Sequence, residues 1–137
     1  MDRRGPGRTY YGIDELQRRR FDVRAERRAA ILREIEKRSS DPSLSAIAIA
    51  NLLGITARYV HLLLEETGAH FSHHVLDKRL EKAAALLRDS QWRGRLIIEI
   101  AAEAGFTDIS HFNRAFRRKY CATPSAIRES AGRDEKL

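Results

Sequence analysis

The strongest constraint on how this chain folds is a short pattern that occurs twice, 51 residues apart. It reads "IANLLGIT" at residues 49–56 and "IAAEAGFT" at residues 100–107. Each copy has Ile-Ala, three residues, a glycine, one apolar residue and a threonine, and apolar residues at helical spacing follow. A helix, a short turn containing glycine and a second helix form a helix-turn-helix unit. The sequence therefore predicts two such units, about residues 45–66 and 96–119.

The second helix of each unit has one apolar side that is predicted to pack inward, since its members recur three and four residues apart. These inward residues are Val60, Leu63 and Leu64 in the first unit, and Phe112, Ala115 and Phe116 in the second. The second turn is one residue longer than the first. Thr56 and Asp108 therefore correspond to each other as the residues that cap the two helices.

The opposite side of each second helix carries side chains that can read DNA bases. A major groove admits one helix, arginine can bond guanine at two points, and asparagine can bond adenine in the same way. We also expect Leu62 and Ile109 to reach thymine methyl groups. The predicted base-facing residues are Arg58, His61, Leu62, Ser110, Asn113 and Arg114.

A second group of residues on or near the same helices is predicted to contact the phosphate backbone. Three consecutive cations close the second unit, and basic and hydroxyl side chains are the usual partners of phosphate oxygens. The predicted phosphate contacts are Thr56, Tyr59, Thr107, His111, Arg117, Arg118 and Lys119.

The remaining segments read as helices or as terminal extensions, and no stretch shows the alternation of a strand. We predict an all-α fold of about seven helices, with two helix-turn-helix subdomains joined by a long central helix. The predicted domain covers residues 22–130, with a first helix at 22–38, the linker helix at about 72–89 and a last helix that begins at Pro124. A basic, flexible segment, 1–21, is expected before it and a short tail, 131–137, after it.

Composition narrows the function classes. The net charge of +7 and pI near 10.1 favour a polyanionic partner. Residues 1–38 hold 12 basic and 7 acidic side chains, so most of the excess precedes the repeat. A single cysteine excludes a disulfide framework, and the adjacent His73 and His74 have no cysteine or carboxylate at zinc-finger spacing. No nucleophile, acid and base set emerges, and no apolar run approaches the ~18 residues of a membrane span. We expect neither enzyme activity, nor a metal or cofactor, nor a membrane partner, and we expect a cytoplasmic location.

From the repeat onward the sequence closely resembles the DNA-binding domain of the AraC/XylS family of bacterial transcription regulators. "TGAHF" and "RLEKA" match the family between the units, and "IIEIAAEAGFTDISHFNRAFRRKYCATPSAIR" resembles its signature segment. The resemblance covers about residues 26–129. It implies a sequence-specific regulator, an activator, whose two recognition helices enter adjacent major-groove segments of double-stranded DNA on the bacterial nucleoid. It also implies RNA polymerase as a partner.

This chain departs from the family in ways that carry expectations. The family usually has glycine where Cys121 stands, so Cys121 is expected to strain a left-handed turn by ~1 kcal/mol. Ile47 and Ala48 occupy positions that are often polar. Family members often carry a separate N-terminal sensing or dimerisation domain, and only about 40 residues precede the first unit here. The alternative functions are a protein-interaction module and a non-specific DNA binder on the same fold.

Overall fold

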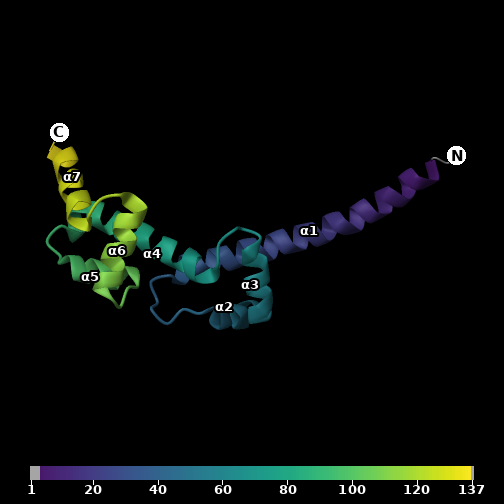
Figure 1. The fold of residues 1–137 in the computed structure, drawn as a ribbon, viewed down its shortest axis with the longest axis horizontal. Helices are drawn as coiled ribbons and strands as arrows, with labels where there is room; N and C mark the ends of the chain where they lie inside the picture. Colours follow the sequence, from purple (N-terminus) through teal and green to yellow (C-terminus); the bar gives the residue numbers. More distant parts are fainter. Residues whose placement is uncertain (1–3, 137) are drawn as a thin grey trace.

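The computed structural model describes residues 4–136, with the side chains of residues 14–134. Every regular element in that range is helical, and two helix-turn-helix units flank a long helix (Figure 1). The all-α prediction is therefore confirmed. The elements are α1 (Arg4–Arg38), α2 (Ala46–Leu53), α3 (Ala57–Glu65), α4 (Phe71–Arg88), the 3₁₀ turn η1 (Ser90–Trp92), α5 (Ile97–Ala104), α6 (Ile109–Tyr120) and α7 (Pro124–Lys136).

The first helix is much longer than predicted. The expected start at residue 22 is wrong, because α1 runs unbroken for 35 residues from Arg4 and its first half projects from the body of the molecule (Figure 1). Pro6 lies in the first turn, where a missing N–H costs nothing. Glu15 then pairs along the helix with Arg18 and Arg19. Residues 4–21 are therefore helical, and α7 likewise continues through most of the expected tail. Residues 1–3 and 137 lie outside the described range.

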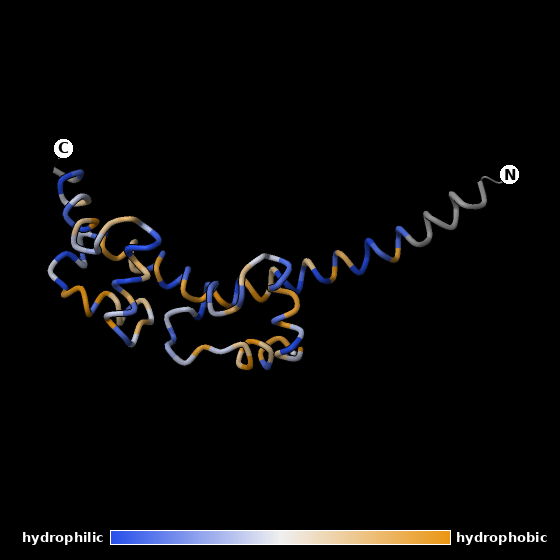
Figure 2. Tube along the Cα trace, in the orientation of Figure 1, coloured by the Kyte–Doolittle hydropathy of each residue, from blue (hydrophilic) through white to orange (hydrophobic). Residues whose placement is uncertain are grey.

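The molecule has two separate apolar cores, and α4 contributes to both. Phe71 and Val75, at the start of α4, join the first core between α1, α2 and α3. Leu80 and Leu87, further along the same helix, join the second core with α5 and α6. Figure 2 shows the apolar stretches in the two helix-turn-helix units. The central helix therefore holds one unit at each end.

The second core contains a series of aromatic rings packed against one another, whereas Phe71 is the one buried aromatic residue of the first among the described side chains. Phe112 lies between Phe106 and Phe116, with ring centroids 4.9 and 5.5 Å away. Tyr120 continues the series at 4.7 Å from Phe116. Ring pairs at such separations add about 0.5–1.5 kcal/mol beyond the apolar area that they bury. This series runs along α6 and anchors its inner face.

The two units meet at one polar junction. Arg79 of α4 donates from Nε to the carbonyl oxygen of Ser39 at 2.7 Å and from its terminal nitrogen to that of Asp41 at 2.9 Å. Lys82 bonds the hydroxyl of Ser40 at 2.5 Å. The loop after α1 is thereby tied to α4, and the buried Gly105 at the end of α5 packs directly against that loop.

Gly105 admits no side chain at this junction. Its φ is +112°, and a Cβ atom there would lie 2.6 Å from the carbonyl oxygen of Ser39 and 2.8 Å from Nε of Arg79. The Nε of Arg79 donates a hydrogen bond to the carbonyl oxygen of Ser39. Neither atom can move away from the other without breaking this bond. Gly54, its counterpart in the first unit, has φ +68° and open space around it.

We predict that Gly105→Ala lowers the free energy of unfolding by clearly more than Gly54→Ala does. Both substitutions carry the backbone cost of a positive φ, about 1 kcal/mol. Only the first adds a clash with main-chain atoms. Urea denaturation of both variants measures the difference, and equal losses would mean that the junction yields to an extra methyl group.

Candidate nucleic-acid interface

The second helix of each unit begins at a capped N-terminus. The hydroxyl of Thr56 accepts a hydrogen bond from the backbone N–H of Tyr59 at 3.0 Å. The carboxylate of Asp108 accepts from the N–H groups of Ser110 at 2.9 Å and His111 at 3.3 Å. Both predicted caps are confirmed. The first turn of α3 and of α6 is therefore ordered before any ligand arrives, and its free side faces solvent.

The inward and outward faces of α3 are those expected. Val60, Leu63 and Leu64 are fully buried in the first core. Arg58, His61 and Leu62 are exposed. Arg58 has no hydrogen-bonded or ion-paired partner among the side chains that the structure describes, so its guanidinium is available for a ligand.

The faces of α6 follow the same rule, with one correction. Phe112, Ala115 and Phe116 are buried, whereas Ser110, Asn113 and Arg114 are exposed. Asn113 and Arg114 border one open groove, which also includes Arg117 and Arg118. Ile109 is the exception, because it is half-buried against the second core. The expectation that it reaches a thymine methyl group is therefore not supported by its position.

The side chains predicted for phosphate contact fall into two groups. Thr56, Thr107 and His111 are exposed, and so are the two arginines near the end of α6. Tyr59 is half-buried against α1. The ring of His111 lies edge-on to the ring of Phe106, with the centroids 5.9 Å apart. His111 therefore packs against Phe106 and is still exposed to solvent.

Lys119 differs from the rest of that group. Its ammonium group pairs with Asp77 of α4 and lies 3.7 Å from a carboxylate oxygen of Glu81. Partial burial lowers the pKa of Lys119, but the bond and the charge of Asp77 outweigh this and raise the pKa. Partial burial conversely raises the pKa of Asp77, and the bond from Lys119 brings it below its ordinary value. Lys119 thus joins α6 to the central helix, and its cation is largely neutralised.

The C-terminal end of α3 is bonded to two arginines of α1. Arg24 and Arg28 both bond the carboxylate of Glu66, which follows α3. Those two hydrogen bonds, from Arg28 first and Arg24 second, hold the pKa of Glu66 below its ordinary value. Arg28 also donates from Nε to the carbonyl oxygen of Leu63 at 3.2 Å. The sequence interpretation missed these contacts, because their partners lie 35 to 42 residues apart and no local pattern marks them.

The turn after α6 holds Cys121 in the left-handed conformation, with φ 56°. It is the only residue other than glycine with a positive φ in the described range. Its N–H closes the helix on the carbonyl oxygen of Arg117 at 2.8 Å. The left-handed turn expected at Cys121 is confirmed, and glycine would adopt it without the cost that a Cβ atom adds.

The described residues contain no metal-ion site and no single helix that could span a membrane. No group of three or more His, Cys, Asp or Glu side chains there could hold a metal ion. No single described helix is long and apolar enough to cross a membrane. The pair Ala46–Leu53 and Ala57–Glu65, bent by 104°, satisfies length and composition together, and it is the first helix-turn-helix unit.

The geometry agrees with a known family. A helix-turn-helix domain model matches residues 49–130, which are more than half of the chain. The chain belongs to the AraC-type helix-turn-helix family, a family of DNA-binding transcription regulators. It is 34% identical over 105 residues to the transcriptional activator RhrA of Rhizobium meliloti, covering 77% of this chain and 33% of that protein. It is 35% identical over 88 residues to the transcriptional activator RhaS of Escherichia coli, covering 64% and 30%. This AraC-type chain thus spans about a third of the length of these relatives.

Solved structures show the same AraC-type fold. One is the C-terminal domain of AraT, a response regulator of Geobacillus stearothermophilus, with a TM-score of 0.66, 27% identity, and coverage of 75% of this chain and 84% of that one. Another is a Chromobacterium violaceum transcriptional regulator described as containing an AraC-type DNA-binding domain. Its TM-score is 0.68 at 24% identity, covering 78% and 94%, and this likeness concerns the fold alone.

We predict that Asp77→Asn weakens the acid sensitivity of this domain. Because the folded-state pKa of Asp77 is lowered, its stabilising effect is complete above the ordinary carboxyl pKa and is lost as pH falls through the lowered value. Thermal melts between about pH 6 and pH 3 should show a steeper loss in the wild type than in the variant. If the melting temperatures of the wild type and the variant fell in parallel with pH, the Asp77–Lys119 pair would have no role in stability.

Proposed function

We propose that this chain binds double-stranded DNA in a sequence-specific manner and regulates transcription. The observation that carries the proposal is that two capped helices, α3 and α6, each expose a polar face while their apolar faces are buried. The spacing is compatible as well. The central helix α4 has 18 residues and spans roughly 27 Å, and successive major-groove segments lie about 34 Å apart.

The two helices are unequal as readers of base edges. Asn113 and Arg114 of α6 can each bond a purine at two points. In α3 only Arg58 has this capacity, beside His61 and Leu62, which supply a ring and an apolar contact. We therefore assign the larger share of hydrogen-bonded base recognition to α6. The exposed hydroxyl of Ser110 adds a further polar contact at the start of that helix.

We predict that Arg114→Ala weakens binding to a site selected from a randomised duplex pool by about 1–3 kcal/mol and relaxes the preference at one base pair. Arg118→Ala is the matched variant, because it removes the same side chain from the same helix at a position assigned to phosphate. It should weaken selected and scrambled duplexes alike. Fluorescence anisotropy with both duplexes measures this, and unchanged affinity of Arg114→Ala for the selected site would overturn its assignment.

We further propose that the regulator activates transcription in the bacterial cytoplasm, on the nucleoid, with RNA polymerase as a second partner. The support is that two relatives, RhrA and RhaS, are named transcriptional activators. The match covers only about a third of the length of those relatives. We also propose that a sensing or dimerisation domain lies N-terminal to this domain in the complete regulator. Transcription from a promoter carrying the selected site, with purified polymerase, tests the sign: a rise supports activation and a fall indicates repression.

One observation favours the alternative of a protein-interaction module. Ile47 and Leu52 of α2 and Leu62 of α3 are exposed on the first unit. Selection from a randomised duplex pool separates the two functions. An enriched sequence supports the regulator, whereas weak binding without enrichment that salt abolishes supports the alternatives.

A further inference from the structure

The projecting helix α1 carries a strip of arginines beside α3, the helix of the first unit that is proposed to read bases. The strip consists of Arg19, Arg20, Arg24 and Arg27. Arg27 lies over the ring of Tyr59 on α3, 5.6 Å from the guanidinium carbon to the ring centroid. Tyr59 is adjacent to Arg58, which the proposed function assigns to base contact. The guanidinium of Arg27 therefore stands at the rim of the surface that would enter the groove.

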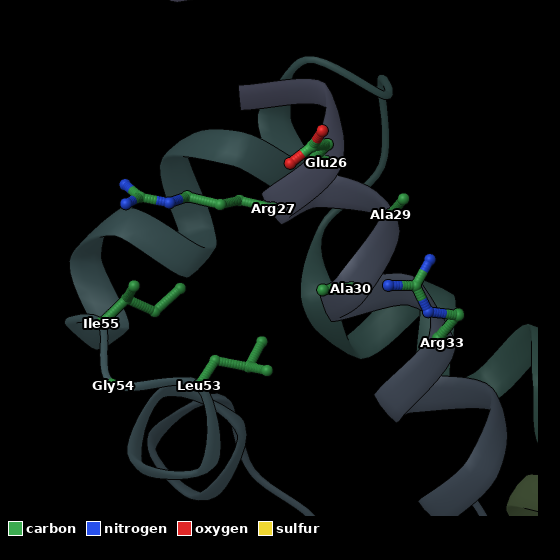
Figure 3. Close-up of a pocket in the computed structure, with 8 residues that line it drawn as sticks. All are labelled: Glu26, Arg27, Ala29, Ala30, Arg33, Leu53, Gly54 and Ile55. Atoms are coloured by element: carbon green, nitrogen blue, oxygen red, sulfur yellow. The ribbon is translucent and has the colours of Figure 1, made fainter. Parts of the chain in front are cut away.

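Two grooves border this point, and both are lined in part by arginines of α1. The first has a volume of about 500 Å³ and lies between α1 and the turn at Leu53–Ile55, with Arg27 and Arg33 on its helix side (Figure 3). The second, of about 370 Å³, continues outward along α1 from Tyr59. Its walls are Arg19, Arg20, Val23 and Arg24.

Not every cation of the strip is available. Arg19 lies 3.7 Å from a carboxylate oxygen of Glu15, and Arg24 bonds Glu66. Arg20 and Arg27 have no ion-paired carboxylate among the described side chains. They are seven residues apart and therefore only about 20° apart around the helix, on the side that meets Tyr59. Glu26 is the one acidic residue that lines either groove.

We propose that Arg20 and Arg27 contact the phosphate backbone of DNA outside the first major-groove segment. This inference rests on the proposed function, since it places α1 beside a recognition helix that lies in the groove. A helix in a major groove has a phosphate strand on each side, and a strip of unpaired guanidinium groups is complementary to that charge. These two arginines do not contact bases. They extend the length of DNA that the protein covers on the side of the first unit.

The test compares Arg20→Ala and Arg27→Ala with Arg18→Ala. Arg18 lies about 160° around the helix from Arg20. It pairs with Glu15, so the control removes a paired cation from the same turn on the opposite face. Alanine retains helix propensity at all three positions. Affinity is measured by anisotropy from 50 to 200 mM salt on the selected duplex and on a scrambled duplex of the same length.

We expect Arg20→Ala and Arg27→Ala each to weaken both duplexes about threefold to tenfold and to lower the salt slope by about 0.9. Arg18→Ala should match the wild type. Three variants with wild-type slopes would overturn the strip while leaving the proposed function intact. Equal losses in all three, Arg18→Ala included, would overturn it too, because bulk charge then explains the effect. If no sequence is enriched yet the two strip variants still lose affinity, the strip stands and sequence specificity fails.

Discussion

The arrangement of this molecule depends on the contact between Gly105 and the main chain at Ser39. The end of α5 packs against the loop that follows α1, and Arg79 of α4 bonds that loop through two carbonyl oxygens. Three segments, one from each unit and one from the central helix, therefore share one buried point. Because main-chain atoms form most of it, the contact has little freedom to relax.

The central helix completes that constraint by belonging to both cores. Phe71 and Val75 are buried with the first unit, and Leu80, Ala83, Ala84 and Leu87 with the second. The Asp77–Lys119 pair adds a polar tie between the same helix and α6. A rigid linker matters for a protein with two recognition helices, since both must meet the duplex in register. Binding by one helix then brings the other close to its groove without a further loss of freedom.

Residue periodicity predicted the units well and the contacts between them poorly. The repeat placed both turns, both caps and both buried faces, because each depends on residues within a few positions of one another. The junction at Arg79 joins residues about 40 apart, and no local pattern marks it. The sequence predicts too short an α1, because dense charge and the early Gly5, Pro6 and Gly7 are typical of a flexible segment. Lys119 was assigned to phosphate, although an acidic residue on another helix neutralises it, which sequence spacing does not reveal.

The central claim is that a rigid body reads two groove segments at once, and changing the spacing of its site tests this most directly. A duplex selected from a random pool should contain two preferred blocks about one helical turn apart. Inserting about five base pairs between the blocks turns the second to the opposite face of the DNA. The account predicts that affinity then falls to that of a duplex carrying one block alone. Unchanged affinity after the insertion would contradict it, because the two units would then bind independently or only one would read the sequence.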